Sequence, residues 1–217
     1  MKKNKKLKII YEDKDIIIIN KESKILTIKD NKSNIPSLYE MVRDYLKKKN
    51  KNNKVFIVHR LDKDTSGLII FAKNIESKNF LQNYWNTLVS RKYNAVCRNN
   101  FKNDFGSIKS YLKETKTLYV YSTNNKNNQY AHTDYIVISK TNKYALVDID
   151  IKTGRKNQIR VHLNDINCPI VGDKKYGNIK ASYLMLNANY LKFTHPKTKE
   201  IMKFKIENPK YFEKYIR

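Results

Sequence analysis

Cysteine is scarce in this sequence: Cys97 and Cys168 are the only two among 217 residues, and they lie far apart. There is no CxxC pair and no histidine at ligand spacing, so the sequence indicates neither a disulfide framework nor a zinc site. Unpaired cysteines are typical of reducing compartments. We therefore expect a cytoplasmic protein without a structural metal.

Long apolar stretches are also missing. The basic first residues would suit a signal peptide, but the apolar stretch that follows them covers only residues 7–11 and contains Lys8, which is too short. No run approaches the roughly 18 apolar residues that a membrane span needs. The sequence therefore predicts neither a signal peptide nor a membrane anchor.

Negative charge is in the minority, with 20 acidic residues against 45 lysines and arginines and a net charge of +25. This charge strains a compact monomer unless a polyanion shares its surface, so nucleic acid is the first partner to consider. The alternative is a genome rich in A and T, which favours codons for Lys, Asn, Ile and Tyr. Against that background a retained arginine indicates a need for its planar fork. Only seven are present: Arg43, Arg60, Arg91, Arg98, Arg155, Arg160 and Arg217.

The length and a hydrophobic fraction of 40% suffice for one sizeable core. Residues 1–8 are expected to be a solvated basic tail, and residues 9–217 a single domain. We expect this domain to be a monomer.

Apolar periodicity predicts the secondary structure. Strands are expected at residues 16–19, 55–58, 68–72, 92–97, 107–121, 130–139, 144–151, 183–193 and 201–206. Helices are expected from Pro36-Ser37 up to a polar loop at 47–53, and at 75–89 and 156–166. The low-complexity segment 122–129 is expected to be a loop. Many strands, few helices and no repeat together predict a mixed α+β fold.

Two polar segments carry candidate chemistry. Residues 59–67 combine a histidine, an arginine, two aspartates and a Thr-Ser-Gly turn between expected strands, which is where a scaffold can hold a reacting group. Either Asp62 or Asp64 could merely cap this turn, the commoner role of aspartate there. Residues 153–163 place Arg155, Arg160 and His162 within two turns of an expected helix. If this segment is helical, the two arginines are too far apart in angle to share one face fully, which indicates different roles.

Further pieces extend this pattern along the chain. In order they are His59-Arg60-Leu61-Asp62-x-x-Thr65-Ser66-Gly67, Lys92-Tyr93-x-Ala95, Thr153-Gly154-Arg155-x-x-Gln158-Ile159-Arg160-Val161-His162, Pro169-Ile170-x-Gly172-Asp173-x-x-Tyr176-Gly177, Leu186-Asn187-Ala188 and Phe193-x-His195-Pro196. In this order and spacing they resemble the motifs of RluA-type RNA pseudouridine synthases, over about residues 10–206. Four of only five glycines fall inside them.

The resemblance implies a mostly antiparallel sheet core with flanking helices and an active-site cleft at the sheet centre. It implies isomerisation of uridine to pseudouridine in RNA, without a metal or an organic cofactor. By motif position Asp62 is the catalytic carboxylate, either as a nucleophile toward the sugar or as the group that enables a glycal route. Both routes need an ionised carboxylate in a partly dehydrated pocket, and so a cation beside it. Arg160 matches that cation, and Tyr93 matches a tyrosine that stacks on the base and is placed for proton transfer.

The resemblance also implies contacts with RNA. Arg60 matches the side chain that fills the gap left when the uridine swings out of its stack. Thr65 in the same motif is a further RNA-binding candidate, and Arg155 either contacts phosphate or braces its loop. His59 and His162 are expected to be structural, because the mechanism needs no imidazole. Lysine clusters at 2–8, 47–54 and 197–205 are candidates for holding RNA, with plain solvated faces as the alternative.

The chain departs from the family pattern at four positions, where His, His, Gly and Pro are usual: Asn157, Asn187, Cys97 and Glu22. These departures put local geometry and substrate fit in question rather than the chemistry. We also expect a stand-alone catalytic domain without the S4 RNA-binding domain of many relatives. Within this resemblance we expect large-subunit ribosomal RNA as the substrate. The alternatives are tRNA, or a non-catalytic RNA-binding protein or chaperone of the same fold.

Overall fold

The computed structural model of the chain describes residues 7–30 and 35–216. It divides into two compact units, the first reaching to Val89 and including Leu191–Ile206, the second comprising Ser90–Tyr190 and the residues from Glu207. Strand β10 (Leu186–Thr194) contributes its beginning to the second unit and its end to the first. The single domain expected at 9–217 stays a prediction. Residues 1–6 of the expected basic tail lie outside the described residues.

The first unit is built on buried antiparallel strands. Its strands are β1 (Ile9–Glu12), β2 (Ile16–Lys21), β3 (Phe56–Ile57), β4 (Ser66–Ala72) and β11 (Ile201–Lys205). β2 lies between β1 and β4, and β4 also pairs with β3. Ile16 lies opposite Ala72, and Lys21 opposite Gly67. The four consecutive isoleucines of β2 are at most 1% exposed, because this strand is covered on both faces.

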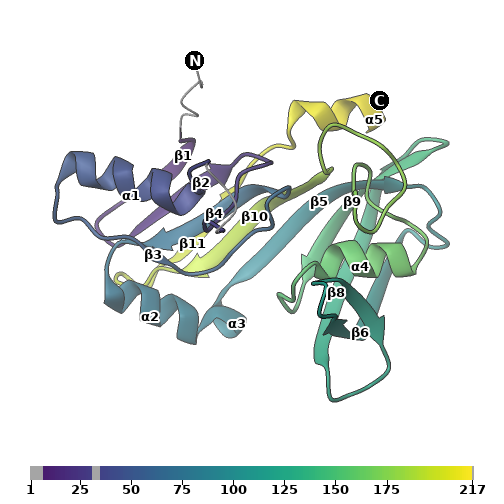
Figure 1. The fold of residues 1–217 in the computed structure, drawn as a ribbon, viewed down its shortest axis with the longest axis horizontal. Helices are drawn as coiled ribbons and strands as arrows, with labels where there is room; N and C mark the ends of the chain where they lie inside the picture. The colour runs from purple at the N-terminus through teal and green to yellow at the C-terminus, as the bar shows by residue number, and fades with distance from the viewer. Residues whose placement is uncertain (1–6, 31–34, 217) are drawn as a thin grey trace. The chain divides into compact units, whose positions relative to one another are not determined.

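The described residues of this unit form three helices. Helix α1 (Leu38–Lys49) begins at a capping box in which Ser37 Oγ accepts from the Glu40 N–H and the Glu40 carboxylate accepts from the Ser37 N–H. It continues through Lys49, so the polar loop expected from residue 47 begins later than predicted. The single helix expected at 75–89 is wrong: α2 (Ile75–Asn83) and α3 (Trp85–Leu88) are separated at Tyr84. Figure 1 shows α1 and α2 on opposite sides of strands β2 and β4.

The second unit is an antiparallel sheet in the order β5-β9-β8-β6-β7. Its strands are β5 (Ser90–Arg98), β6 (Phe105–Glu114), β7 (Val120–Thr123), β8 (Gln129–Lys140) and β9 (Tyr144–Ile151). β9 alternates between partly exposed and buried residues along its whole length, as a strand with one covered face does. The continuous strand expected at 107–121 is wrong, because a turn at residues 115–119, with Leu118 at φ 63°, separates β6 from β7.

Helix α4 (Gln158–Asp165) covers one face of this sheet at β7 and β8 (Figure 1). A buried cluster under the helix contains Leu112, Val120, Ala131 and Val161. Near its C-terminus the chain forms a short 3₁₀ helix (Lys210–Phe212) and α5 (Glu213–Ile216). The predicted α+β class with a mostly antiparallel sheet is therefore confirmed. Among the described residues, no helix is long and apolar enough to cross a membrane.

Candidate active site

Asp62 lies in the loop between β3 and β4 of the first unit, partly exposed, as the motif position predicts. The backbone on both sides of it is tied to the turn that follows β2. Thr27 Oγ1 donates to Leu61 O over 2.8 Å and accepts from the Leu61 N–H over 3.2 Å. Ser23 Oγ donates to Asp64 O over 2.7 Å. These bonds tie the main chain on both sides of Asp62, and the Asp62 side chain is partly exposed.

Lys21 supplies the third tie and was not predicted. Its side chain is fully buried, and its ammonium donates to Ile25 O at 2.9 Å, to Lys63 O at 3.0 Å and to Glu22 O at 3.1 Å. A buried ammonium needs several acceptors to offset its lost hydration. Here the acceptors come from both the turn after β2 and the residue that follows Asp62. The lysine therefore joins these two segments.

His59 has structural contacts, in line with the prediction for it. Its Nε2 accepts from the Ile70 N–H over 3.2 Å, and its ring lies 4.5 Å from that of Trp85. Arg60 is exposed, as an RNA contact requires, whereas Thr65 is only 3% exposed. The RNA contacts of Arg60 and Thr65 stay predictions.

In the second unit, Arg160 on α4 forms a forked ion pair with Asp173. Nε lies 2.8 Å from Oδ2 and Nη2 lies 2.8 Å from Oδ1. Burial alone would raise the pKa of Asp173, but the hydrogen bonds and charge of Arg160, with the N–H groups of Lys175 and Tyr176, lower it from its ordinary value. Asp173 is therefore an ionised partner that fixes the guanidinium plane.

Asn157, a departure from the family pattern, belongs to the same network. It lies at the start of α4 with φ 55°, in the left-handed region that asparagine tolerates better than most residues. Its Oδ1 accepts from Arg160 Nη1 over 3.1 Å, and its Nδ2 donates to the Tyr176 hydroxyl over 3.1 Å. An amide at this position thus supports Arg160 rather than disturbing it. Asn187 is buried in β10.

Gln158 explains why the motif loop before α4 has one conformation. Its buried side chain accepts from Thr153 Oγ1 at 2.7 Å and from the Arg155 N–H at 3.0 Å, and it donates to His132 O at 2.9 Å. Arg155 is exposed, and its Nε donates to Tyr130 O over 3.0 Å. This hydrogen bond fits one of the two roles expected for Arg155, which is to brace its loop.

His162 is fully buried, with Nδ1 2.9 Å from Thr133 Oγ1 and Nε2 3.0 Å from Ser110 Oγ. Burial, assisted by the nearby His132, lowers its pKa to about 4. The ring is therefore neutral at physiological pH and acts as a polar link inside the second unit.

Tyr93 lies on β5, opposite Ile149 of β9, and is 6% exposed. The second unit thus contains two of the three predicted catalytic residues, Tyr93 and Arg160, and the first unit contains Asp62. The pairing of Asp62 with Arg160 stays a prediction, as do the catalytic roles of all three. The predicted cleft at the sheet centre also stays a prediction.

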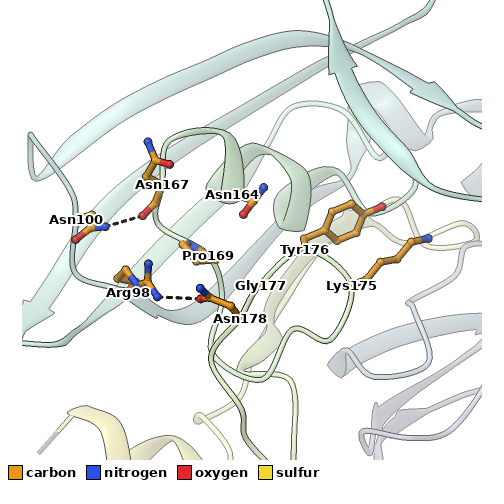
Figure 2. Close-up of a pocket in the computed structure, with 9 residues that line it drawn as sticks. All are labelled: Arg98, Asn100, Asn164, Asn167, Pro169, Lys175, Tyr176, Gly177 and Asn178. Atoms are coloured by element: carbon orange, nitrogen blue, oxygen red, sulfur yellow. Dashed lines mark hydrogen bonds between the residues drawn. The ribbon is translucent and has the colours of Figure 1, made fainter.

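An open polar cavity of about 630 Å³ lies in the second unit. Figure 2 shows Arg98 directed at Asn178 and Asn100 at Asn167, and these two pairs are hydrogen-bonded. The cavity is lined by Arg98, Asn100, Asn164, Asn167, Pro169, Lys175, Tyr176, Gly177 and Asn178. Neither Tyr93 nor Arg160 lines it, so it is not the recess that the motifs predict.

Among the residues that the structure describes, one group in the first unit has metal-ligand composition: Asp13, Asp15 and His195. The Asp13 carboxylate already accepts from the N–H groups of Asp15 and Ile16, from the Tyr11 hydroxyl, and lies 2.8 Å from His195 Nε2. With protein donors on both oxygens, the group is a hydrogen-bonded junction rather than a set of open ligands.

Comparison with known proteins identifies the family. A family model described as RNA pseudouridylate synthase matches residues 15–165, more than half of the chain. The chain belongs to the RNA pseudouridylate synthase family. The resemblance to RluA-type enzymes is thereby confirmed.

Curated members of the RNA pseudouridylate synthase family align with almost all of this chain. The ribosomal large subunit pseudouridine synthase D of Borreliella burgdorferi is 35% identical over 94% of this chain and 66% of its own length. The ribosomal large subunit pseudouridine synthase C of Rickettsia bellii is 34% identical over 95% of this chain and 70% of its own. The chain thus spans about two thirds of the length of these relatives.

A solved structure supports the fold. Human RNA pseudouridylate synthase domain containing 4 superimposes with a TM-score of 0.80 over 95% of this chain and 90% of its own, at 24% identity.

Sequence reasoning missed two residues that order the site, Lys21 and Asp173, and it treated a third, Asn157, as a departure that puts local geometry in question. Asp173 lay inside a quoted motif and is the only acid in it, so its position directly after Gly172 was a usable signal. Lys21 carried no signal in composition, because lysine is the most frequent cation in the chain.

Proposed function

We propose that this protein is an RNA pseudouridine synthase that isomerises specific uridines in structured RNA. The observation that carries the proposal is the family match together with the presence of Asp62, Tyr93 and Arg160 at their motif positions. The reaction breaks the bond from N1 of uracil to the ribose, turns the base and forms a bond from C5 to the ribose. The proton on C5 is released and N1 takes up a proton from solvent, so the product is an isomer of the substrate.

Asp62 is the catalytic carboxylate in this proposal. It acts either by attacking the sugar or by enabling a glycal intermediate. In both routes the carboxylate has to be held within a fraction of an ångström of its reactive position beside the ribose, and a side chain is held only as well as its backbone. The ties from Thr27, Ser23 and Lys21 to residues 61, 63 and 64 support this role, since they fix the chain on both sides of Asp62.

Arg160 is the proposed cationic partner, and Tyr93 the proposed base-stacking residue. A guanidinium already ordered by Asp173 and Asn157 loses little conformational entropy on pairing with a further anion. Arg60 and Arg155 are exposed cations of the two main motifs and are proposed to contact RNA. No metal or organic cofactor enters the proposal.

The preferred substrate is large-subunit ribosomal RNA, because relatives of the chain are named for that RNA. A tRNA substrate is the alternative within the same chemistry. A non-catalytic RNA chaperone of the same fold is the alternative outside it, and substitution of Asp62, Tyr93 or Arg160 would have been its signature.

The test is release of tritium from C5-labelled uridine in ribosomal RNA and, separately, in tRNA. The purified full chain is expected to release tritium, and Asp62→Asn is expected to abolish release while RNA binding persists. Asp64→Asn, the same change two residues away, is the matched control and should retain most turnover. Absence of release from both RNAs, or full turnover by Asp62→Asn, would overturn the proposal. Mapping pseudouridines in cells with and without the gene then identifies the RNA.

A further inference from the structure

The outer sheet of the second unit carries an uncommon set of side chains on one face. The residues that form it, called the tyrosine face below, are Lys109, Tyr111 and Lys113 of β6, Tyr121 of β7, and Tyr130 and His132 of β8. The strand register places Tyr111 opposite Tyr130, Lys109 opposite His132, and Lys113 opposite Tyr121. Side chains directly opposite in an antiparallel pair share a face, so these six side chains form one continuous surface.

The other face of the same strands is the covered one. Leu112, Val120 and Ala131 alternate with the tyrosine face and lie in the buried cluster under α4. Tyr93 also belongs to that covered side. The register pairs Tyr93 with Ile149, Ile149 with Tyr135, and Tyr135 with Gly106, so these residues share the face of Ala131 and Leu112. The tyrosine face is therefore on the reverse of the sheet from Tyr93.

The aromatic rings on this face are accessible. Tyr130 is 41% exposed and Tyr121 is 37% exposed. The Tyr111 and Tyr130 rings meet edge to face at 5.7 Å and 62°, and the His132 ring lies 6.4 Å from Tyr130. A chain rich in tyrosine is expected to have single tyrosines scattered over its surface. Here three tyrosines lie at neighbouring positions on three adjacent strands, so the high tyrosine content alone does not explain their arrangement.

The charges around these rings favour an anion. Lys109 and Lys113 are exposed on the face, and Arg155 is bonded to the Tyr130 carbonyl at its edge. The next acid along this face of β8, Asp134, lies 2.9 Å from His132 and 3.4 Å from Lys152. Aromatic rings interleaved with cations are the arrangement by which proteins stack unpaired bases while neutralising the phosphates between them.

We propose that the tyrosine face is a second RNA-binding surface, which stacks unpaired nucleotides other than the target uridine. That its ligand is RNA rests on the proposed function. The face would let the enzyme distinguish a structured RNA with an adjacent single-stranded loop from the same uridine in a short fragment. It thereby adds a specificity determinant that lies outside the catalytic motifs.

The test measures binding of a short fluorescein-labelled oligoadenylate to the full chain by fluorescence anisotropy. This probe contains no uridine and so is not a substrate. The double variant Tyr121→Leu/Tyr130→Leu is expected to bind it at least about tenfold more weakly, since each stacked base contributes on that scale. Tyr121→Phe/Tyr130→Phe keeps both rings and should bind within about twofold of the wild type. Tyr84→Leu, at an exposed tyrosine of the first unit, is the control.

Two further measurements keep the inference refutable. Binding of a uridine-free G·C duplex of equal length should change little in the leucine variant, because paired bases are not open to stacking. Lys109→Gln/Lys113→Gln should lower the slope of log affinity against log salt by about 1.4, at about 0.7 per phosphate contact. Unchanged oligoadenylate binding, equal loss for duplex, or equal loss in the phenylalanine variant overturns the inference, and so does an unchanged salt slope.

The outcomes also separate this inference from the proposed function. If the wild type released no tritium from RNA while the leucine variant lost oligoadenylate binding, the proposed function would fail and the binding surface would stand. If release were normal and the leucine variant bound like the wild type, the proposed function would stand and the binding surface would fail. If both proposals hold, the leucine variant is expected to have a KM for ribosomal RNA about tenfold higher, at unchanged kcat.

Discussion

Replacement of Lys21 by methionine tests whether the Asp62 loop is ordered by a buried cation. The change keeps an unbranched side chain of similar length but removes the ammonium. At least three carbonyl oxygens lose a donor: those of Ile25, Lys63 and Glu22. The first is buried and the other two are partly reached by water, so the three losses are unequal.

The cost follows from these contacts. A hydrogen bond from a charged group contributes about 1.5–3 kcal/mol, and an unsatisfied buried carbonyl retains its full desolvation penalty. The replacement by methionine also removes the unfavourable free energy of burying a charge, which is several kcal/mol and partly offsets the loss. With one bond fully buried and two partly compensated by water, we expect the free energy of unfolding to fall by about 2–4 kcal/mol. For a chain of this size that lowers Tm by about 4–16 °C.

The functional consequence is expected in kcat. Lys63 directly follows Asp62, and its carbonyl oxygen accepts from the Lys21 ammonium. Loss of this bond therefore lets the Asp62 carboxylate leave the position that we propose for catalysis. Tritium release should fall at least about tenfold at temperatures where the variant is folded, whereas oligoadenylate binding should stay within about twofold. Thermal melting and single-turnover release measure the two effects. Lys14→Met, at an exposed position between β1 and β2, is the control. If Lys21→Met matched this control in Tm and kcat, the role assigned to the buried lysine would be refuted.

Three further changes probe the second unit. Arg160→Lys replaces the forked guanidinium with a single ammonium, so one of the two hydrogen bonds to Asp173 is lost. The free energy of unfolding in urea should fall by about 1–3 kcal/mol, and an unchanged urea midpoint would contradict this prediction. The pKa of His162 is about 4 in the folded protein and 6.5 in the unfolded chain, so the unfolded chain takes up the proton first as pH falls. The free energy of unfolding should therefore fall by about 3 kcal/mol between pH 6.5 and pH 4. His162→Gln should flatten that part of the curve of stability against pH, as measured by denaturant unfolding. Gly172→Ala would place a Cβ 2.0 Å from Tyr183 O, at a residue whose φ is +79°. The free energy of unfolding should fall by about 2–4 kcal/mol, and a Tm equal to that of the wild type would refute the clash.

Most strands were predictable because their side chains obey local rules. β9 was predicted at residues 144–151 and is observed there, since its strict alternation reflects one covered face. The errors came where apolar residues continue across a turn. Leu118 and Tyr119 extend the apolar pattern of β6, but the left-handed φ of Leu118 ends the strand. The ring of Tyr119 packs on that of Tyr176, 57 residues further along, and this contact accompanies the turn. A local sequence pattern does not include both rings.

The candidate site divides in a similar way. The motifs predicted that Asp62 lies on a loop between strands and that His162 is structural, and the structure has both features. They did not predict the fork between Arg160 and Asp173, because a sequence names charged residues without saying which oxygen meets which nitrogen. The bridging amide of Asn157 was interpreted as a weak point for the same reason.

The sequence by itself determined the family and the α+β class and named the residues that we propose for catalysis, since these depend on residue types and spacings along one chain. Only the tertiary structure decided that Lys21 is buried beneath the Asp62 loop, that Asp173 orders Arg160, and that three tyrosines share one exposed face. These facts depend on which side chains from distant segments meet and which are excluded from water. Burial and pairing set the charge state and the mobility of each group, so they become visible only once the strands are in register.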